Sequence, residues 1–186
     1  PRAFNLGTMT QCLPAAGILR LRSQLRLAFS DPITRFFPHA PESKRGITVF
    51  HLLTHTSGLR GHSAGAGIMR RDGAANAILS LPLAYPPGTH YAYADDDYQL
   101  LAAITEIASG LSWVDFVKRE FLVPARMSST GFQGGDWGHK GADGMRSTAR
   151  DIYRWGIDIP DARTVVGAES RDAETPLEPE RTEPPS

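Results

Sequence analysis

Helical spacing of apolar residues, broken repeatedly by proline and glycine, is the pattern that most constrains the fold of this chain. The clearest stretch runs from Asp97 to Ser109, where Tyr98, Leu101 and Ile104 fall on one helical face and Gly110 follows. The chain of 186 residues has 14 prolines and 18 glycines, which keep such stretches short. We therefore expect a set of short helices that bury one face each.

The same pattern predicts further helices along the first 160 residues. Residues 8–22 form one helix that is bent at Pro14 or begins near it, since an interior proline costs a helix about 3 kcal/mol. Shorter helices are predicted at 49–54, capped by Thr48, at 74–81, at 113–121, capped by Ser112, and at 147–155. Arg2–Leu6 is the best strand candidate. The sequence therefore predicts a mainly α fold.

The composition changes near residue 160. Residues 161–186 carry seven acidic and three basic residues, a net charge of −4, and few large apolar residues follow Val166. Such a segment buries too little apolar surface to offset the entropy of ordering. We expect one domain over residues 1–160 and a disordered, acidic, proline-rich tail over 161–186, with an acidic docking tail as the alternative.

Charge and composition exclude several classes of function. The whole chain has a formal net charge of zero, whereas nucleic-acid-binding domains carry a basic surplus. A single cysteine, Cys12, rules out a disulfide framework within the chain. No apolar run reaches the length of about 18 residues that a membrane span needs. We expect no nucleic-acid partner, no membrane span and no cofactor.

Four segments, taken together and in this order, resemble one enzyme family. They are Ile47–Leu59, which contains Leu-Leu-Thr-His-Thr-Ser-Gly-Leu, then Pro87–Tyr93, Pro124–Phe132 and Gly144–Asp151. The chain resembles the serine β-lactamase and penicillin-binding-protein superfamily, on the class C and esterase side, over about residues 4–158. The resemblance implies the helical domain of an α+β fold, with most of the antiparallel sheet missing from this chain.

The resemblance also implies where the reactive groups of the family would lie. Members attack an amide or ester carbonyl with the serine of a Ser-x-x-Lys motif and form an acyl-enzyme. In register, this chain reads Thr8-Met9-Thr10-Gln11. Thr8 keeps a hydroxyl, but Gln11 has no titratable nitrogen that could accept the proton of the nucleophile. Thr8 and Gln11 are thus the predicted positions of a nucleophile and of a lost base.

A second motif, Tyr-x-Asn in the family, reads Tyr93-Ala94-Asp95 here. Tyr93 is kept as a proton-transfer partner, whereas Asp95 replaces an amide by a carboxylate, which disfavours the phenolate of Tyr93. No Lys-Thr-Gly motif appears in the chain. We expect a catalytically impaired, truncated relative of these hydrolases. The alternatives are a non-catalytic binding or scaffold protein on the same fold, and a weak esterase that uses Thr8 and Tyr93.

Other sequence patterns suggest alternative functional sites. Residues 61–65 fit the Gly-x-Ser-x-Gly elbow of α/β-hydrolases with Ser63 as nucleophile, although a helix and a turn precede them instead of a strand. His51 and His55 have the i, i+4 spacing of a zinc site, but packed or hydrogen-bonded histidines are the simpler interpretation. Residues 95–97 read as a solvated acidic turn that caps a helix rather than as a cation site, and Cys12 reads as a buried, inert thiol.

The missing sheet has its own implication. A nucleophile helix without its sheet exposes an apolar face, which favours self-association or a protein partner. A small amide or ester is the ligand that the resemblance implies. Intact members of the family usually work outside the cytoplasm, and no targeting pattern in this chain indicates a compartment.

Overall fold

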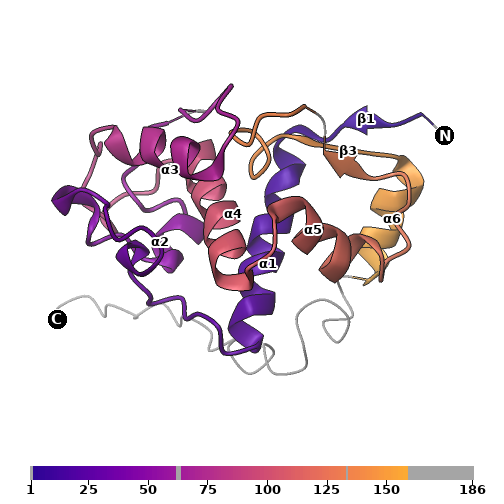
Figure 1. The fold of residues 1–186 in the computed structure, drawn as a ribbon, viewed down its shortest axis with the longest axis horizontal. Coiled ribbons are helices and arrows are strands. Elements are labelled where there is room, and N and C mark those ends of the chain that lie inside the picture. The colour runs from indigo at the N-terminus through magenta and orange to yellow at the C-terminus, as the bar shows by residue number, and fades with distance from the viewer. Residues whose placement is uncertain (1, 62–63, 133, 159–186) are drawn as a thin grey trace, which may run out of the picture.

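Two central helices, α1 (Cys12–Ser23) and α4 (Asp95–Ser109), pack side by side and carry the rest of the fold (Figure 1). The structure is a computed structural model that describes residues 2–61, 64–132 and 134–158. Gly17 lets the two helices approach closely, because a Cβ atom at that position would lie 3.2 Å from Oγ1 of Thr105. The close approach fixes the position of α1 along α4.

Shorter elements surround this pair. Helices α2 and α3 lie on one side of it and α6 on the other, with α5 across the centre (Figure 1). The bounds are β1 Phe4–Asn5, η1 Gly7–Gln11, η2 Ile33–Arg35, η3 Glu42–Lys44, α2 Val49–Leu53, α3 Arg71–Ser80, α5 Trp113–Val117, η4 Lys118–Leu122, β2 Gly131–Phe132, β3 Met145–Ser147 and α6 Ala149–Asp158.

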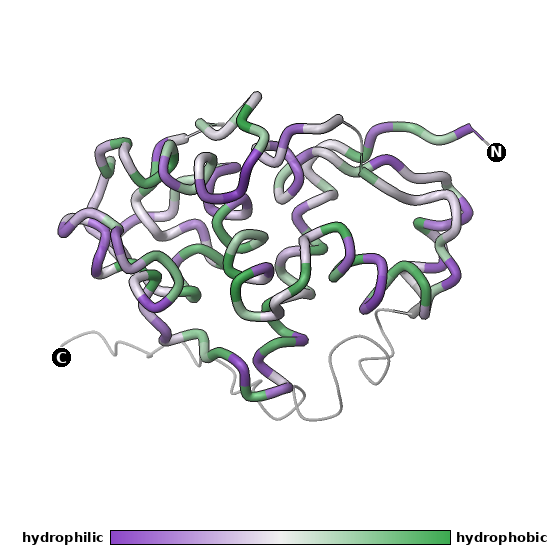
Figure 2. Tube along the Cα trace, viewed as in Figure 1, coloured by the Kyte–Doolittle hydropathy of each residue, from purple (hydrophilic) through white to green (hydrophobic). Residues whose placement is uncertain are grey.

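The hydrophobic core lies between α1, α4 and α5. Figure 2 shows hydrophobic stretches along these central helices. Leu13, Ile18, Leu100, Ile104 and Trp113 are all completely buried. Full burial of an aliphatic side chain contributes about 1.5–3 kcal/mol, so this cluster is a main source of stability.

Two predicted helix starts are confirmed by their caps. At the start of α2, the backbone N–H of His51 donates to Thr48 Oγ1 at 3.3 Å, and the N–H of Thr48 donates back to Nδ1 of His51 at 3.2 Å. Ser112 accepts from the N–H of Asp115 at the start of α5. Helix α1 begins at Cys12, so Pro14 lies in the first turn, where an N–H has no partner within the helix.

The structure corrects the sequence prediction where elements are very short. Ser147 belongs to strand β3 and does not open a helix; α6 begins two residues later. Within the described residues, the strands form a small antiparallel sheet in the order β1-β3-β2, with Phe4 opposite Ser147 and Phe132 opposite Met145. Strands of two or three residues are too short to show an alternating pattern, so β2 and β3 were not predicted.

The predicted helix over 113–121 is divided in the structure. It begins as the α-helical turn α5 and continues as η4, a π-helical turn in which the N–H of Val123 donates to the carbonyl of Lys118 at 2.9 Å. A π turn widens the helix, so side chains beyond it point in other directions than a continuous α-helix would give.

Among the described residues, no single helix is both long and apolar enough to cross a membrane. The pair formed by α4 and the α5–η4 segment reaches that length and apolarity only together, with a bend of 81° between the two parts.

The uncovered apolar face that the sequence predicted for the helix over residues 8–22 is limited to one stripe on α1. Leu13, Ile18 and Leu21 of α1 are fully buried, and the half-buried residues Cys12 and Leu19 lie on the remaining apolar stripe. The predicted tail, residues 161–186, and the predicted domain end at residue 160 lie outside the described residues.

Two glycines with left-handed backbones provide a matched test of this packing. Gly110 ends α4 with a φ of 74°, and a Cβ atom there would have no neighbour within 4 Å. Gly58 has a φ of 81°, and its Cβ would lie 2.1 Å from the carbonyl oxygen of Tyr85. We expect Gly110→Ala to lower the free energy of unfolding by about 1 kcal/mol, and Gly58→Ala by at least about 3 kcal/mol.

Urea unfolding followed by circular dichroism measures both losses of stability. Equal losses in the two variants would contradict the close approach of the Gly58 and Tyr85 backbones.

Candidate active site

Three of the four predicted site residues form a hydrogen-bonded triangle. The Nε2 group of Gln11 donates to the hydroxyl of Tyr93 at 2.6 Å and to Oδ1 of Asp95 at 3.0 Å. The hydroxyl of Tyr93 in turn donates to the same Asp95 oxygen at 2.7 Å. Gln11 is separated from the other two by more than 80 residues of sequence, so the fold brings them together.

Helix ends position the triangle. Gln11 ends η1 and directly precedes α1, while Asp95 is the first residue of α4 and Tyr93 lies in the extended segment before it. The contact of Gly17 with Thr105 further along both helices shows that α1 and α4 start at the same end of the molecule. Helix N-termini carry partial positive charge, which favours the Asp95 carboxylate there.

The η1 turn before Gln11 is fixed by strand β3. The N–H of Leu6 donates to the carbonyl of Met145 at 3.0 Å, and the N–H of Met145 donates to Oγ1 of the buried Thr10 at 3.3 Å. These two bonds hold the start of α1 against the small sheet. The position of Gln11 therefore depends on the sheet as well as on α4.

Thr8 lies near the triangle in sequence but is not part of it. It is in η1, three residues before Gln11, and its side chain is exposed. Within the described ranges, no hydrogen bond joins Thr8 to Tyr93. Thr8 is exposed to a ligand, and the residue that the resemblance places as its base, Gln11, is an amide.

The surroundings of Tyr93 stabilise its protonated form. Burial of the phenol, the hydrogen bond to Asp95 and the negative charge of that residue raise the pKa of Tyr93 from 10.0 to about 12, while the hydrogen bond from Gln11 acts in the opposite direction. The direction agrees with the one that the sequence predicted from Asp95. At neutral pH, Tyr93 is therefore a hydrogen-bond donor and not a base.

A buried cluster of three polar side chains, Asp97, His55 and Ser57, lies next to the triangle and was not predicted from the sequence. Asp97 is fully buried, joined to Nδ1 of His55 at 2.8 Å and to the hydroxyl of Ser57 at 2.5 Å. Burial raises the pKa of Asp97, and the hydrogen bonds to His55 and Ser57 oppose this increase. The ring of His55 lies 4.8 Å from the ring of Tyr93, so this group helps to position the phenol.

The competing patterns find other roles in the structure. His51 takes part in the α2 cap and His55 pairs with Asp97, which agrees with the hydrogen-bonded interpretation of both. In the part of the chain that the structure describes, no three His, Cys, Asp or Glu side chains are placed to hold a metal ion. The elbow serine, Ser63, lies outside the described residues.

Two further sequence interpretations are decided by burial. The solvated acidic turn over residues 95–97 is wrong, because Asp96 and Asp97 are completely buried in the first turn of α4. Burial raises the pKa of the Cys12 thiol to about 11, so the thiol is protonated at neutral pH, as expected for an inert side chain.

Comparison with known proteins identifies relatives of this chain. Residues 3–186 match the β-lactamase family. The chain is 35% identical over 130 residues to penicillin-binding protein PbpX of Bacillus subtilis (strain 168); the match covers 70% of this chain and 33% of that protein. The chain thus spans about a third of the length of this relative.

Solved structures share the fold. A crystal structure from Bacteroides dorei DSM 17855, described as a β-lactamase, superimposes with a TM-score of 0.80 at 24% identity and covers 92% of this chain and 55% of that chain. The D-stereospecific amidohydrolase from Streptomyces gives a TM-score of 0.76 at 18% identity, covering 88% and 62%. The match over residues 3–186 and the 35% identity over 70% of the chain show that the chain belongs to the β-lactamase family.

Proposed function

We propose that this chain is a catalytically impaired member of the serine-hydrolase family to which it belongs. The observation that carries the proposal is the double hydrogen bond from Gln11 Nε2 to Tyr93 and Asp95. In the family register, position 11 is that of the base, and here both N–H groups of an amide are used as donors. An amide in that role accepts no proton from a nucleophile.

The remaining groups do not replace the base. If Thr8 attacks a carbonyl, its proton must pass to a neighbour. The phenol of Tyr93 has a pKa of about 12, so it is protonated at neutral pH and cannot accept that proton. General-base assistance is worth about 10²–10⁴ in rate, and nucleophile and base fail together rather than additively. Acylation of Thr8 is therefore expected to be negligible near neutral pH.

The ligand class that we propose is a small amide or ester. It follows from the relatives, which include a penicillin-binding protein and an amidohydrolase. Thr8, which is exposed, and Tyr93, which is 38% exposed, offer such a ligand two contacts. The same two exposed groups favour a weak esterase as the second candidate.

A hydrolysis assay separates the two candidates. We expect no turnover of a chromogenic cephalosporin or of p-nitrophenyl acetate above the buffer rate, and no covalent label from a fluorophosphonate in a peptide-mass map. Thr8→Ala serves as the matched control. Turnover or labelling by the natural chain that disappears in Thr8→Ala would contradict catalytic impairment and support the weak esterase.

A second measurement tests the electrostatics of the triangle. Because the folded protein raises the pKa of Tyr93 above that of an unfolded tyrosine, the protonated form stabilises the fold below pH 10, and this contribution is lost as the pH rises toward 12. Asp95→Asn removes the charge that disfavours phenolate, so we expect Tyr93 to ionise at a lower pH in that variant.

Absorbance at 295 nm reports tyrosine ionisation, and Tyr93→Phe identifies the contribution of this residue among the five tyrosines. Below pH 11, Asp95→Asn should show more phenolate than the natural chain. Identical titration curves would show that Asp95 does not control Tyr93.

A further inference from the structure

We propose that the groove between the α5–η4 segment and strand β2 binds an amphiphile with an aliphatic body and an anionic head group, of the long-chain carboxylate class, with the head group on the ammonium of Lys118. The proposal is independent of the proposed function, because none of Gln11, Tyr93 and Asp95 lines the groove.

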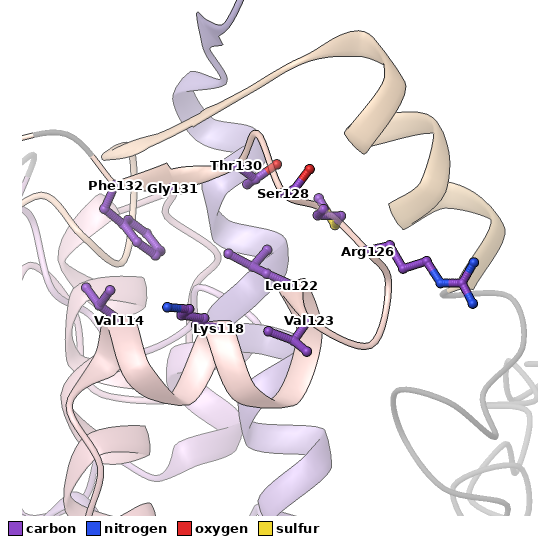
Figure 3. A pocket seen from close by; sticks show the side chains of 10 residues that line it. Val114, Lys118, Leu122, Val123, Arg126, Ser128, Thr130, Gly131 and Phe132 are labelled. Atoms are coloured by element: carbon purple, nitrogen blue, oxygen red, sulfur yellow. The ribbon is translucent and has the colours of Figure 1, made fainter.

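The groove has the size and surface of a small-molecule site. Its volume is about 590 Å³, and ligand pockets measure about 300–1,000 Å³. The wall is mostly apolar, and Figure 3 shows its side chains on facing elements. The apolar lining residues are Val114, Leu122, Val123, Met127 and Phe132.

Part of this apolar wall is in contact with water. The side chain of Val123 is 62% exposed and that of Val114 is 37% exposed. Apolar groups that face water gain about 25 cal/mol for each Å² that a ligand covers. An aliphatic chain that starts at Lys118 and runs along η4 would cover Val123.

The charged residues in the wall favour a ligand with a negative charge. Lys118 and Arg126 line the groove and no aspartate or glutamate does. Among the described residues, no ion pair engages the Lys118 ammonium, and Figure 3 shows Lys118 next to Val114 on the helical side of the groove, across from Phe132. The Arg126 guanidinium points away from the groove in the same view. The anionic head group is therefore assigned to Lys118.

The nearby carboxylates are used elsewhere. Glu120 pairs with Arg20 and Arg119, and Oδ2 of Asp151 accepts hydrogen bonds from the N–H of Ser129 and the hydroxyl of Thr130. Asp115, one helical turn before Lys118, accepts from the hydroxyl of Ser112 at 2.6 Å, and no ion pair joins it to Lys118 among the described residues.

The polar groups of the groove favour an aliphatic body over a peptide. The Thr130 hydroxyl, one of the few polar groups in the wall, is already bonded to Ser147 and Asp151. Most of the wall consists of apolar side chains, which offer no partner for the hydrogen bonds to water that a buried peptide backbone would lose, at a cost of about 1–3 kcal/mol per group. A hydrocarbon chain carries no such groups.

Calorimetric titration of the whole chain with dodecanoate, below its micelle concentration, tests the proposal. We expect saturable binding at one site. Lys118→Gln should weaken it by about threefold to fivefold, since the ion pair is partly exposed. Val123→Glu should weaken it at least about tenfold, because it places a charge in the apolar wall. Dodecyltrimethylammonium, with the opposite charge, should bind more weakly than dodecanoate.

Arg150→Gln is the matched control. Arg150 is exposed on α6 outside the groove, so this variant changes the net charge as Lys118→Gln does and should leave binding unchanged. Lys118 and Val123 are exposed, and thermal unfolding checks that their variants keep the fold.

Three results would overturn the proposal. The first is the absence of saturable dodecanoate binding. The second is binding that is equal in the natural chain, Lys118→Gln and Val123→Glu, which would place the ligand elsewhere. The third is a dimer in sedimentation that Val123→Glu abolishes, which would assign the groove to a second copy of the chain.

Discussion

The packing of α1 along α4 is the constraint on which the rest of the structure depends. At the Gly17–Thr105 contact the absence of a side chain permits the close approach, and the two helices start at one end of the molecule. Gln11 before one helix and Asp95 in the other are then within hydrogen-bond distance. A larger residue at position 17 would push the two helices apart. It would thereby change the distance between Gln11 and Asp95 without contacting either of them.

The site is a triangle of polar side chains on a β-lactamase-family fold. The fold holds Gln11 beside Tyr93, and the ring of His55, which pairs with the buried Asp97, lies 4.8 Å from the ring of Tyr93. Under the function that we propose, two groups stand where the resemblance implies a lysine and an amide: Gln11 donates at the first position, and the Asp95 carboxylate accepts at the second. Each of the three side chains is hydrogen-bonded to the other two, which holds the triangle together as a unit.

The helices were predicted from the spacing of apolar residues and from caps, whereas the site was predicted from the family resemblance. Periodicity and caps found α2, α4 and the start of α5, because Thr48, Gly110 and Ser112 mark helix ends locally. Nothing in the spacing connects Gln11 with Asp95, and only the resemblance to the family joined them.

Other features had no local signal at all. The pair of His55 and Asp97 is 42 residues apart in the chain, and the run of three aspartates suggests exposure, although the fold buries two of them. The strands are shorter than one period of any pattern, and the groove arises from the meeting of η4 with β2.

The π turn η4 has a consequence for insertions and deletions. A backbone bond that spans five residues joins the N–H of Val123 to the carbonyl of Lys118, and a second one joins Met127 to Leu122 just after the turn. Such a turn contains one residue more than an α-helix needs. Loss of one residue would let the helix close to ordinary winding, and everything after it would rotate by about 100°. Chain length at this point, and not only side-chain identity, therefore controls whether a hollow exists beside β2.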